Sequence, residues 1–330
     1  MATVLEVARR AGVSLATASR VQNGVATVAP EIRDRVNAAI KELDYRPNPM
    51  AQGLRRGRSN TVALVVGDLA QRHLFELTVN VQVALEGEGM DLLLFNQGHS
   101  SARLNDFLLR APSMGLRGVV IATSDTFPDR ALPLIERIKA TGAPVLSVGQ
   151  NLTHLGIPSI VYDERDATAR SVQYLLEKGH RRIAYVGRLK GSAVGAERFE
   201  GYKAAMTSAG AFDPELVWDR TYRYAAGRDA VAQALAKDIK FTAVQAGSDE
   251  IAAGAMAALH DHGVRVPDDV ALVGFGDIEL GSYLRPALTT VSSDAALAAQ
   301  YVSQLLNEGQ DSGDAALTTI SRSLVKRDSA

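Results

Sequence analysis

Apolar and polar residues alternate along this chain in two different ways, and the change falls near residue 58. Before it, apolar residues recur three and four positions apart, as they do on one face of a helix. After it, short and nearly continuous apolar runs alternate with amphipathic segments, which is typical of buried parallel strands joined by crossover helices. The pattern predicts a small helical domain followed by a larger α/β body.

The helical domain is predicted to begin with two short helices. Leu5, Ala8 and Ala11 share one face of the first helix. Ser14 is a favoured N-cap for a second helix over residues 15–23. Two short helices that are joined by a tight turn and braced by a third helix are typical of a helix-turn-helix bundle.

The third helix supplies that brace. Pro30 favours its first turn, because proline fits the first helical position. Its predicted inward residues follow helical spacing and are Ile32, Val36, Ala39, Ile40 and Leu43. The pattern therefore predicts an all-α headpiece over residues 1–46.

The second helix has few apolar residues, and its outward side chains are small or form hydrogen bonds. In a helix-turn-helix protein this helix enters the major groove of DNA. The predicted DNA-contacting residues with hydroxyl or amide groups are Thr3, Ser14, Thr17, Ser19 and Asn23. Arg20 can donate two hydrogen bonds to guanine, and Leu15 and Ala16 can contact thymine methyl groups. The alternative is a small bundle whose hydroxyls only cap helices and contact water.

The distribution of charge favours DNA binding. The whole chain has a net charge of −1, but residues 1–58 hold ten basic and five acidic residues. This part therefore carries +5, and the remainder carries −6. A basic domain on an acidic body predicts that only the basic domain meets a polyanion.

Residues 47–58 are predicted to link the two parts. Asn48 followed by proline is typical of a helix start, but a helix of about six residues is unstable alone in water. Gly53 weakens it by about 1 kcal/mol relative to alanine. The segment is either a flexible basic linker or a hinge that folds only on DNA, with Leu54 as an apolar wedge in the minor groove.

Several stretches of the chain resemble the LacI/GalR family of transcription regulators. They are VLEVARRAGVSLATASRVQNG, VNAAIKELDYRPNPMAQGL, EKGHRRIAYVG, ERFEGYKAAM, SDEIAAGAM, GVRVPDDVALVGFGD, PALTTV and SLVKRD. The resemblance covers nearly the whole chain. It implies a homodimer that binds a near-palindromic operator in double-stranded DNA under the control of a small-molecule effector. A cytoplasmic location is expected separately, because the N-terminus lacks the apolar region and cleavage site of an export signal. The resemblance also implies that Leu15, Ala16 and Arg20 read bases and that Leu54 is the hinge wedge. Family members often have bulkier or polar residues where Leu15 and Ala16 stand.

The body, residues 59–330, is predicted to consist of two doubly wound α/β lobes. Nine strands are predicted, at 61–68, 90–97, 117–123, 143–149, 159–164, 181–187, 215–222, 241–249 and 270–276. Ligands on such sheets bind beyond the carboxyl ends of the strands. The resemblance implies a periplasmic-binding-protein-like body, with one lobe at about 59–161 and 291–322 and the other at about 162–290. It places crossings between the lobes near 160–163 and 289–293.

No pattern in the body indicates an enzyme, a metal site or a bound cofactor. The chain has no cysteine, and the motifs G-x-G-x-x-G, H-E-x-x-H and G-x-S-x-G are absent. The adjacent carboxylates at 163–164 and 268–269 are expected to be solvated helix caps. A binding protein without a DNA role remains the alternative, but it would need a signal peptide, and the N-terminus does not resemble one. No run of apolar residues is long enough to cross a membrane.

The resemblance implies a set of effector contacts at the strand ends. Arg198 matches the arginine that family members use to hold effector oxygens, and its alternative is an ion pair with Glu197 on the surface. Thr123, Tyr222 and Ser248 match other strand-end contacts. For Tyr222, packing within one lobe is an equal alternative.

One departure from the family pattern bears on the effector. Family members commonly have an aspartate where Gly276 stands, and here Asp277 follows one position later. Arg72 and His73 lie in the first loop, where the family is often apolar. Losing an acid and gaining two basic groups favours an anionic effector, a sugar acid or a sugar phosphate. In the alternative, Arg72 and His73 face water and Asp277 replaces the missing aspartate.

Overall fold

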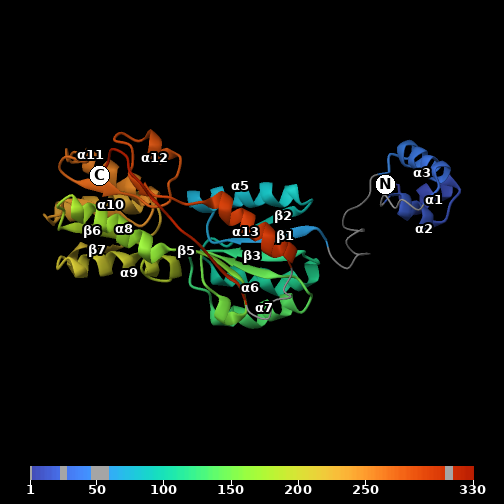
Figure 1. Cartoon of the computed structure of the whole chain (residues 1–330), viewed down its shortest axis with the longest axis horizontal. Coiled ribbons are helices and arrows are strands. Elements are labelled where there is room, and N and C mark those ends of the chain that lie inside the picture. Colours follow the sequence, from blue (N-terminus) through green and yellow to red (C-terminus); the bar gives the residue numbers. More distant parts are fainter. Residues whose placement is uncertain (1, 23–27, 46–58, 309–314) are drawn as a thin grey trace. The chain divides into compact units, whose positions relative to one another are not determined.

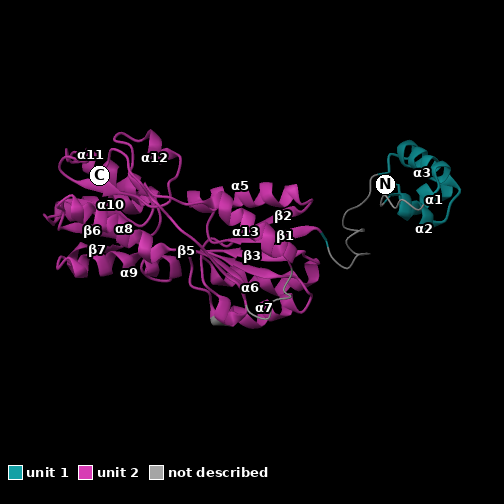
Figure 2. Ribbon diagram, in the orientation of Figure 1, with its two compact units in different colours: residues 1–59 teal, residues 60–330 magenta. Residues whose placement is uncertain are grey.

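A computed structural model of the chain describes residues 2–22, 28–45, 59–308 and 315–330. The chain forms two compact units, residues 1–59 and 60–330 (Figure 2). Within the described ranges, no helix has both the length and the apolar character needed to cross a bilayer.

The first unit holds three helices within its described residues. They are α1 (Val4–Ala11), α2 (Leu15–Gln22) and α3 (Pro30–Glu42) (Figure 1). A capping box begins α1, because Thr3 Oγ1 accepts from the Glu6 amide and the Glu6 carboxylate accepts from the Thr3 amide. Gly12 ends α1 with a φ of 64°, in the left-handed region that glycine adopts without strain.

The three helices share one apolar core. Its buried residues are Val7, Ala8, Ala11, Ala18, Val21, Val28, Val36 and Ala39, with Ile32, Ile40 and Leu43 packed against them. The predicted inward face of α3 is confirmed. For α1 the prediction was wrong at Leu5, which is 45% exposed. The buried stripe of α1 runs through Val7, Ala8 and Ala11 instead, and Leu5 lies outside it.

The first lobe of the second unit is a six-stranded parallel sheet. Its strands are β1 (Thr61–Val66), β2 (Asp91–Asn96), β3 (Gly118–Ala122), β4 (Val145–Val148), β5 (Ser159–Tyr162) and β11 (Leu317–Ile320), in the order β11-β5-β4-β3-β1-β2. The packed helices are α5 (Arg72–Gly87) and α13 (Ala295–Glu308) on one face, and α6 (Ser101–Arg110) and α7 (Leu132–Lys139) on the other. Short 3₁₀ turns are η1 (Ala111–Met114), η2 (Asp129–Ala131) and η3 (Thr153–Leu155).

The second lobe is a four-stranded parallel sheet. Its strands are β6 (Ile183–Gly187), β7 (Val217–Asp219), β8 (Ala243–Ala246) and β9 (Ala271–Val273), in the order β7-β6-β8-β9. The helices are α8 (Glu164–Glu177) and α9 (Ala193–Ser208) on one face, and α10 (Tyr224–Ala236) and α11 (Asp249–Asp261) on the other, with α12 (Leu280–Tyr283) and η4 (Pro214–Leu216) nearby in sequence. All nine predicted strands and both doubly wound lobes are therefore confirmed.

Three segments connect the lobes (Figure 1). The first leads from β5 into α8, and the second leads from β10 (Thr290–Val291) into α13. The third leads from β11 into β12 (Leu324–Val325), which pairs antiparallel with β10. After β12 the chain stays in the second lobe, where the Ser329 carbonyl accepts from the Leu272 amide at 2.7 Å.

Candidate functional site

The outward face of α2 is exposed, as a DNA-reading helix requires. Leu15 is 40% exposed, and Ala16 and Arg20 are exposed beside it. An apolar side chain held in water on a polar helix is consistent with contact to a thymine methyl group. Thr17 and Ser19 are partly buried on the same helix.

Local contacts fix the turn that leads into α2. Ser14 Oγ accepts from the Thr17 amide at 3.1 Å and lies 2.8 Å from Thr17 Oγ1. Arg35 of α3 donates to the carbonyl oxygens of Ala11 and Gly12. The predicted cap at Ser14 is confirmed, and Arg35 fastens the turn to the third helix.

Three predicted DNA contacts lie outside the described residues. They are Asn23, Asn48 and Leu54. Thr3 is described and exposed, and its hydroxyl and amide are engaged by Glu6.

A cavity lies between the two lobes of the body, and three predicted effector residues line it. These are His73 from α5, Thr123 from the end of β3 and Arg198 from α9. The cavity has a volume of about 40 Å³. Sites that bind small molecules usually have volumes of about 300–1,000 Å³. The lobes must therefore part before a ligand of sugar size can enter.

A buried ionic cluster forms one wall of this cavity. Arg198 Nε and Nη2 donate to the two carboxylate oxygens of Glu164 at 2.8 and 3.2 Å. Arg322 Nη2 donates to Glu164 Oε1 at 2.9 Å. All three residues are 5% exposed. The aromatic ring of Phe275 lies 4.0 Å from Arg198 Cζ and 5.0 Å from Arg322 Cζ, so it faces both guanidinium groups.

The cluster fixes the charges that the cavity presents. Burial opposes ionisation of Glu164, but the charges of Arg198 and Arg322 outweigh it and lower the pKa of its carboxyl to about 2. Burial and the same two positive charges lower the pKa of His73 to about 3. Near neutral pH the cavity therefore holds one carboxylate, two guanidinium groups and an uncharged imidazole.

The other four predicted effector residues do not line the cavity. Arg72 is exposed and lies over the Phe75 ring, with its side chain 3.4 Å from Glu76. Asp277 pairs with Arg327 at 2.6 Å. In this structure His73 lines the cavity, whereas Arg72 and Asp277 do not.

Tyr222 and Ser248 have structural contacts. Tyr222 belongs to the apolar core of the second lobe, and its ring centroid lies 5.9 Å from Arg198 Cζ. Ser248 caps α11 by accepting from the Ile251 amide at 3.3 Å. Lobe packing, the alternative left open for Tyr222, describes its position best.

Several cavity residues were missed from the sequence. They are Glu164 and Arg322, with Tyr162, Ser124 and Ser293. Glu164 was expected to be a solvated cap, and that prediction was wrong, because two arginines hold its carboxylate in the interior. The available signal was position: Glu164 directly follows a predicted crossing between the lobes, where side chains face the cleft.

Further contacts join the lobes outside the cavity. Arg188 pairs with Asp125, and Arg223 pairs with Asp68. The Ala193 amide donates to the Ser124 carbonyl at 3.0 Å. We call the pairs Arg188–Asp125 and Arg223–Asp68 the lobe latch.

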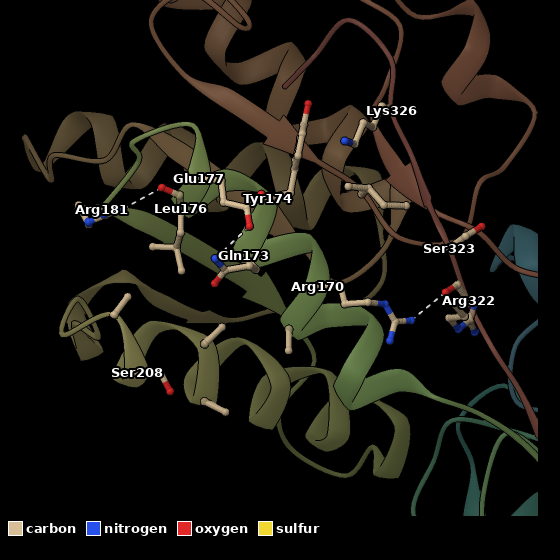
Figure 3. Close-up of a pocket in the computed structure, with 15 residues that line it drawn as sticks. Arg170, Gln173, Tyr174, Leu176, Glu177, Arg181, Ser208, Arg322, Ser323 and Lys326 are labelled. Atoms are coloured by element: carbon tan, nitrogen blue, oxygen red, sulfur yellow. Dashed lines mark hydrogen bonds between the residues drawn. The ribbon is translucent and has the colours of Figure 1, made fainter.

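A larger depression lies on the second lobe, over α8, α9 and β12 (Figure 3). It is open to solvent, and Figure 3 shows its labelled side chains spread along the helices rather than aimed at one point. Except for Arg322 and Tyr174, its labelled polar side chains are exposed, unlike the buried charged groups of the small cavity.

A helix-turn-helix unit joined to a two-lobed α/β body with a polar cavity between its lobes defines a class, the DNA-binding transcriptional regulators. Comparison with known proteins narrows the class to a family. Residues 3–48 match the bacterial regulatory proteins of the lacI family, and residues 172–330 match the periplasmic binding protein-like domain. The HTH-type transcriptional regulator AscG of Escherichia coli (strain K12) is 32% identical over 333 residues, which cover 100% of this chain and 98% of that protein. The chain belongs to the lacI family, whose matched members are regulators rather than enzymes.

Solved structures agree over the full length. The Lac repressor dimer bound to operator and the anti-inducer ONPF has a TM-score of 0.90 at 27% identity, covering 99% of this chain and 98% of that chain. The transcriptional regulator CelR in complex with cellobiose has a TM-score of 0.73 at 30% identity, and both chains are covered at 100%.

Proposed function

We propose that this regulator is a homodimeric repressor of carbohydrate-metabolism genes, and that an anionic effector binding between the lobes controls it. The observation that supports an anionic effector most directly is the buried cluster of Arg198, Arg322 and Glu164 in the cavity wall. It gives a cleft between two α/β lobes an excess of positive charge. An effector with an acid group, a sugar acid or a sugar phosphate, fits that charge.

The headpiece supports the DNA-binding half of the proposal. A basic unit exposes Leu15, Ala16 and Arg20 on one helix, and the related Lac repressor is described as a dimer on its operator. Each headpiece then takes half of a near-palindromic site, so that the symmetry of the DNA mirrors that of the protein.

An exposed apolar stripe on α5 supports the dimer. Phe75, Val79 and Val83 recur at four-residue spacing and are exposed. Such a stripe on an otherwise polar surface is typical of a protein–protein interface. A two-fold axis pairs the stripe with its own copy.

The mechanism that we propose is a change in lobe orientation on effector binding. The lobes must separate and close again around the ligand, because the present cavity is too small for it. The reorientation changes the separation of the two headpieces in the dimer. A marginal hinge helix melts under a small shift, and DNA is released.

One experiment separates this proposal from a binding protein without a DNA role. Selection of duplex DNA in vitro with the full chain should yield a near-palindromic site, and residues 60–330 alone should select none while retaining ligand binding. Failure of the full chain to prefer any duplex over random competitor at moderate salt refutes the proposal.

A further inference from the structure

The ionic cluster in the cavity wall carries an uncompensated positive charge. Two guanidinium groups, of Arg198 and Arg322, face the single carboxylate of Glu164. Asp163 is the next acidic side chain in sequence, and it pairs with Arg170 at 2.8 Å. That outer pair is neutral, so the buried cluster keeps a net charge of +1.

Buried charge of this kind needs a partner. An isolated charge away from water is strongly unfavourable, and proteins compensate it with an opposite charge or a ligand. The aromatic rings of Tyr162 and Phe275 cover the face of the Arg322 guanidinium, with Tyr162 4.0 Å from its Cζ. Ring contacts screen the charge only partly, and an acid group of a ligand would complete the compensation.

Unused hydrogen-bonding atoms point to the same conclusion. In the part of the chain that the structure describes, Arg322 Nε and Ser124 Oγ are buried and have no hydrogen-bond partner. Both residues line the cavity. A buried donor without a partner is unfavourable, so the pair is ready to bind a polar ligand.

We propose that this cavity selects ligands with a single negative charge, sugar acids rather than sugar phosphates, and that Arg322 is the residue that sets the preference. The inference deepens the proposed function and rests on it. A carboxylate of charge −1 makes the cluster neutral. A neutral sugar leaves the cluster at +1, and a phosphate ester, close to −2 near neutral pH, leaves an excess negative charge in the closed cleft.

The direct test is calorimetry on the full chain near neutral pH with matched ligands. For the gluco, galacto and manno series, the aldonate, the aldose and the aldose 6-phosphate are compared. In at least one series the aldonate should bind about 30-fold or more tightly than the aldose, as expected for a desolvated charge pair. It should also bind more tightly than the 6-phosphate.

Two substitutions shift the charge of the cluster in opposite directions. Arg322→Met makes the cluster neutral, and the preference for aldonate over aldose should fall at least about 10-fold.

Glu164→Gln raises the cluster to +2, and the ratio of 6-phosphate to aldonate affinity should rise at least about 10-fold. Arg322→Lys keeps the charge and should keep most of the aldonate preference. Glu177→Gln, on the exposed face of the same helix as Glu164, is the matched control and should change none of the ratios.

The ratio of aldonate to aldose affinity separates a loss of charge recognition from a general disturbance of the structure. Arg322 also donates to the Ser292 carbonyl at 2.7 Å, so its loss disturbs the segments between the lobes, but that disturbance weakens aldonate and aldose alike. If Glu164→Gln does not fold, the Arg322 pair of variants decides alone.

The inference is wrong if the 6-phosphates bind at least as tightly as the aldonates, if no series shows binding, or if Arg322→Met leaves the aldonate preference unchanged. Operator binding, measured by gel shift on the same preparations, keeps the two proposals apart. Operator binding without charge-selective ligand binding overturns only this inference, and absence of operator binding overturns the proposed function.

Discussion

Replacing Glu164 by glutamine should destabilise the body by about 3 kcal/mol at neutral pH. The folded pKa of about 2 against an ordinary value of 4.5 corresponds to about 3 kcal/mol of stabilisation of the ionised form. Breaking a buried ion pair by removing one partner costs about 3–5 kcal/mol. The two figures agree, because the same contacts to Arg198 and Arg322 underlie both.

The direction in which this stabilisation changes with pH follows from the lowered pKa of Glu164. The stabilisation is fully present above the unfolded pKa of about 4.5 and is lost as the pH falls through about 2. The difference between the wild-type chain and Glu164→Gln should therefore shrink from about 3 kcal/mol at neutral pH to about 2 kcal/mol near pH 3.5. Urea unfolding of the body at both pH values measures it, with Glu177→Gln as the exposed control. A difference at neutral pH below about 1 kcal/mol, the range of exposed pairs, or one that does not change with pH, refutes the reasoning.

Three further outcomes are expected. Arg20→Ala should weaken operator binding by about 1–3 kcal/mol and relax specificity at one base pair, measured by gel shift on a panel of single-base variants; uniform weakening across the panel would indicate a phosphate contact instead. Arg188→Met removes one pair of the lobe latch, so the radius of gyration from X-ray scattering should increase and ligand association should accelerate; unchanged scattering and kinetics would show that the latch does not hold the lobes. Gly53→Ala should raise operator affinity and blunt the effector response, because alanine favours a helix by about 1 kcal/mol, and an unchanged titration midpoint would contradict this.

The fold followed from periodicity because strands buried on both faces have a strong signal. β1, for example, is apolar at all but its first residue and is buried from Val62 to Val66. In the short helices it was harder to predict which residues face the core. In α1 both Leu5 and Val7 lie near the apolar stripe, and eight residues do not distinguish them without the neighbouring α3.

The site was harder to predict because its charged members meet only in three dimensions. Glu164 and Arg322 are 158 positions apart, yet their side chains are 2.9 Å apart. The family pattern located Arg198, but it also suggested Asp277, which the nearby Arg327 holds instead. Local sequence shows which residues end strands. It does not show which long side chain turns toward the cleft, because this depends on the oppositely charged residues with which the side chain pairs in the folded protein.

Arg322 belongs both to the cavity and to the segments that connect the lobes, and this sharing gives a physical route for control. Its amide donates to Asp163 in the first connecting segment, its Nη1 donates to Ser292 in the second, and it lies itself in the third. A ligand whose acid group accepts from the free Arg322 Nε acts on a guanidinium that is also bound to Ser292 in the second connecting segment and to Glu164. In the proposed function, the coupling between effector and lobe orientation is the difference in effector-binding free energy between two lobe orientations. Because coupling is reciprocal, the proposal predicts that operator binding changes the affinity of the protein for its effector by the same factor by which the effector changes the affinity for the operator.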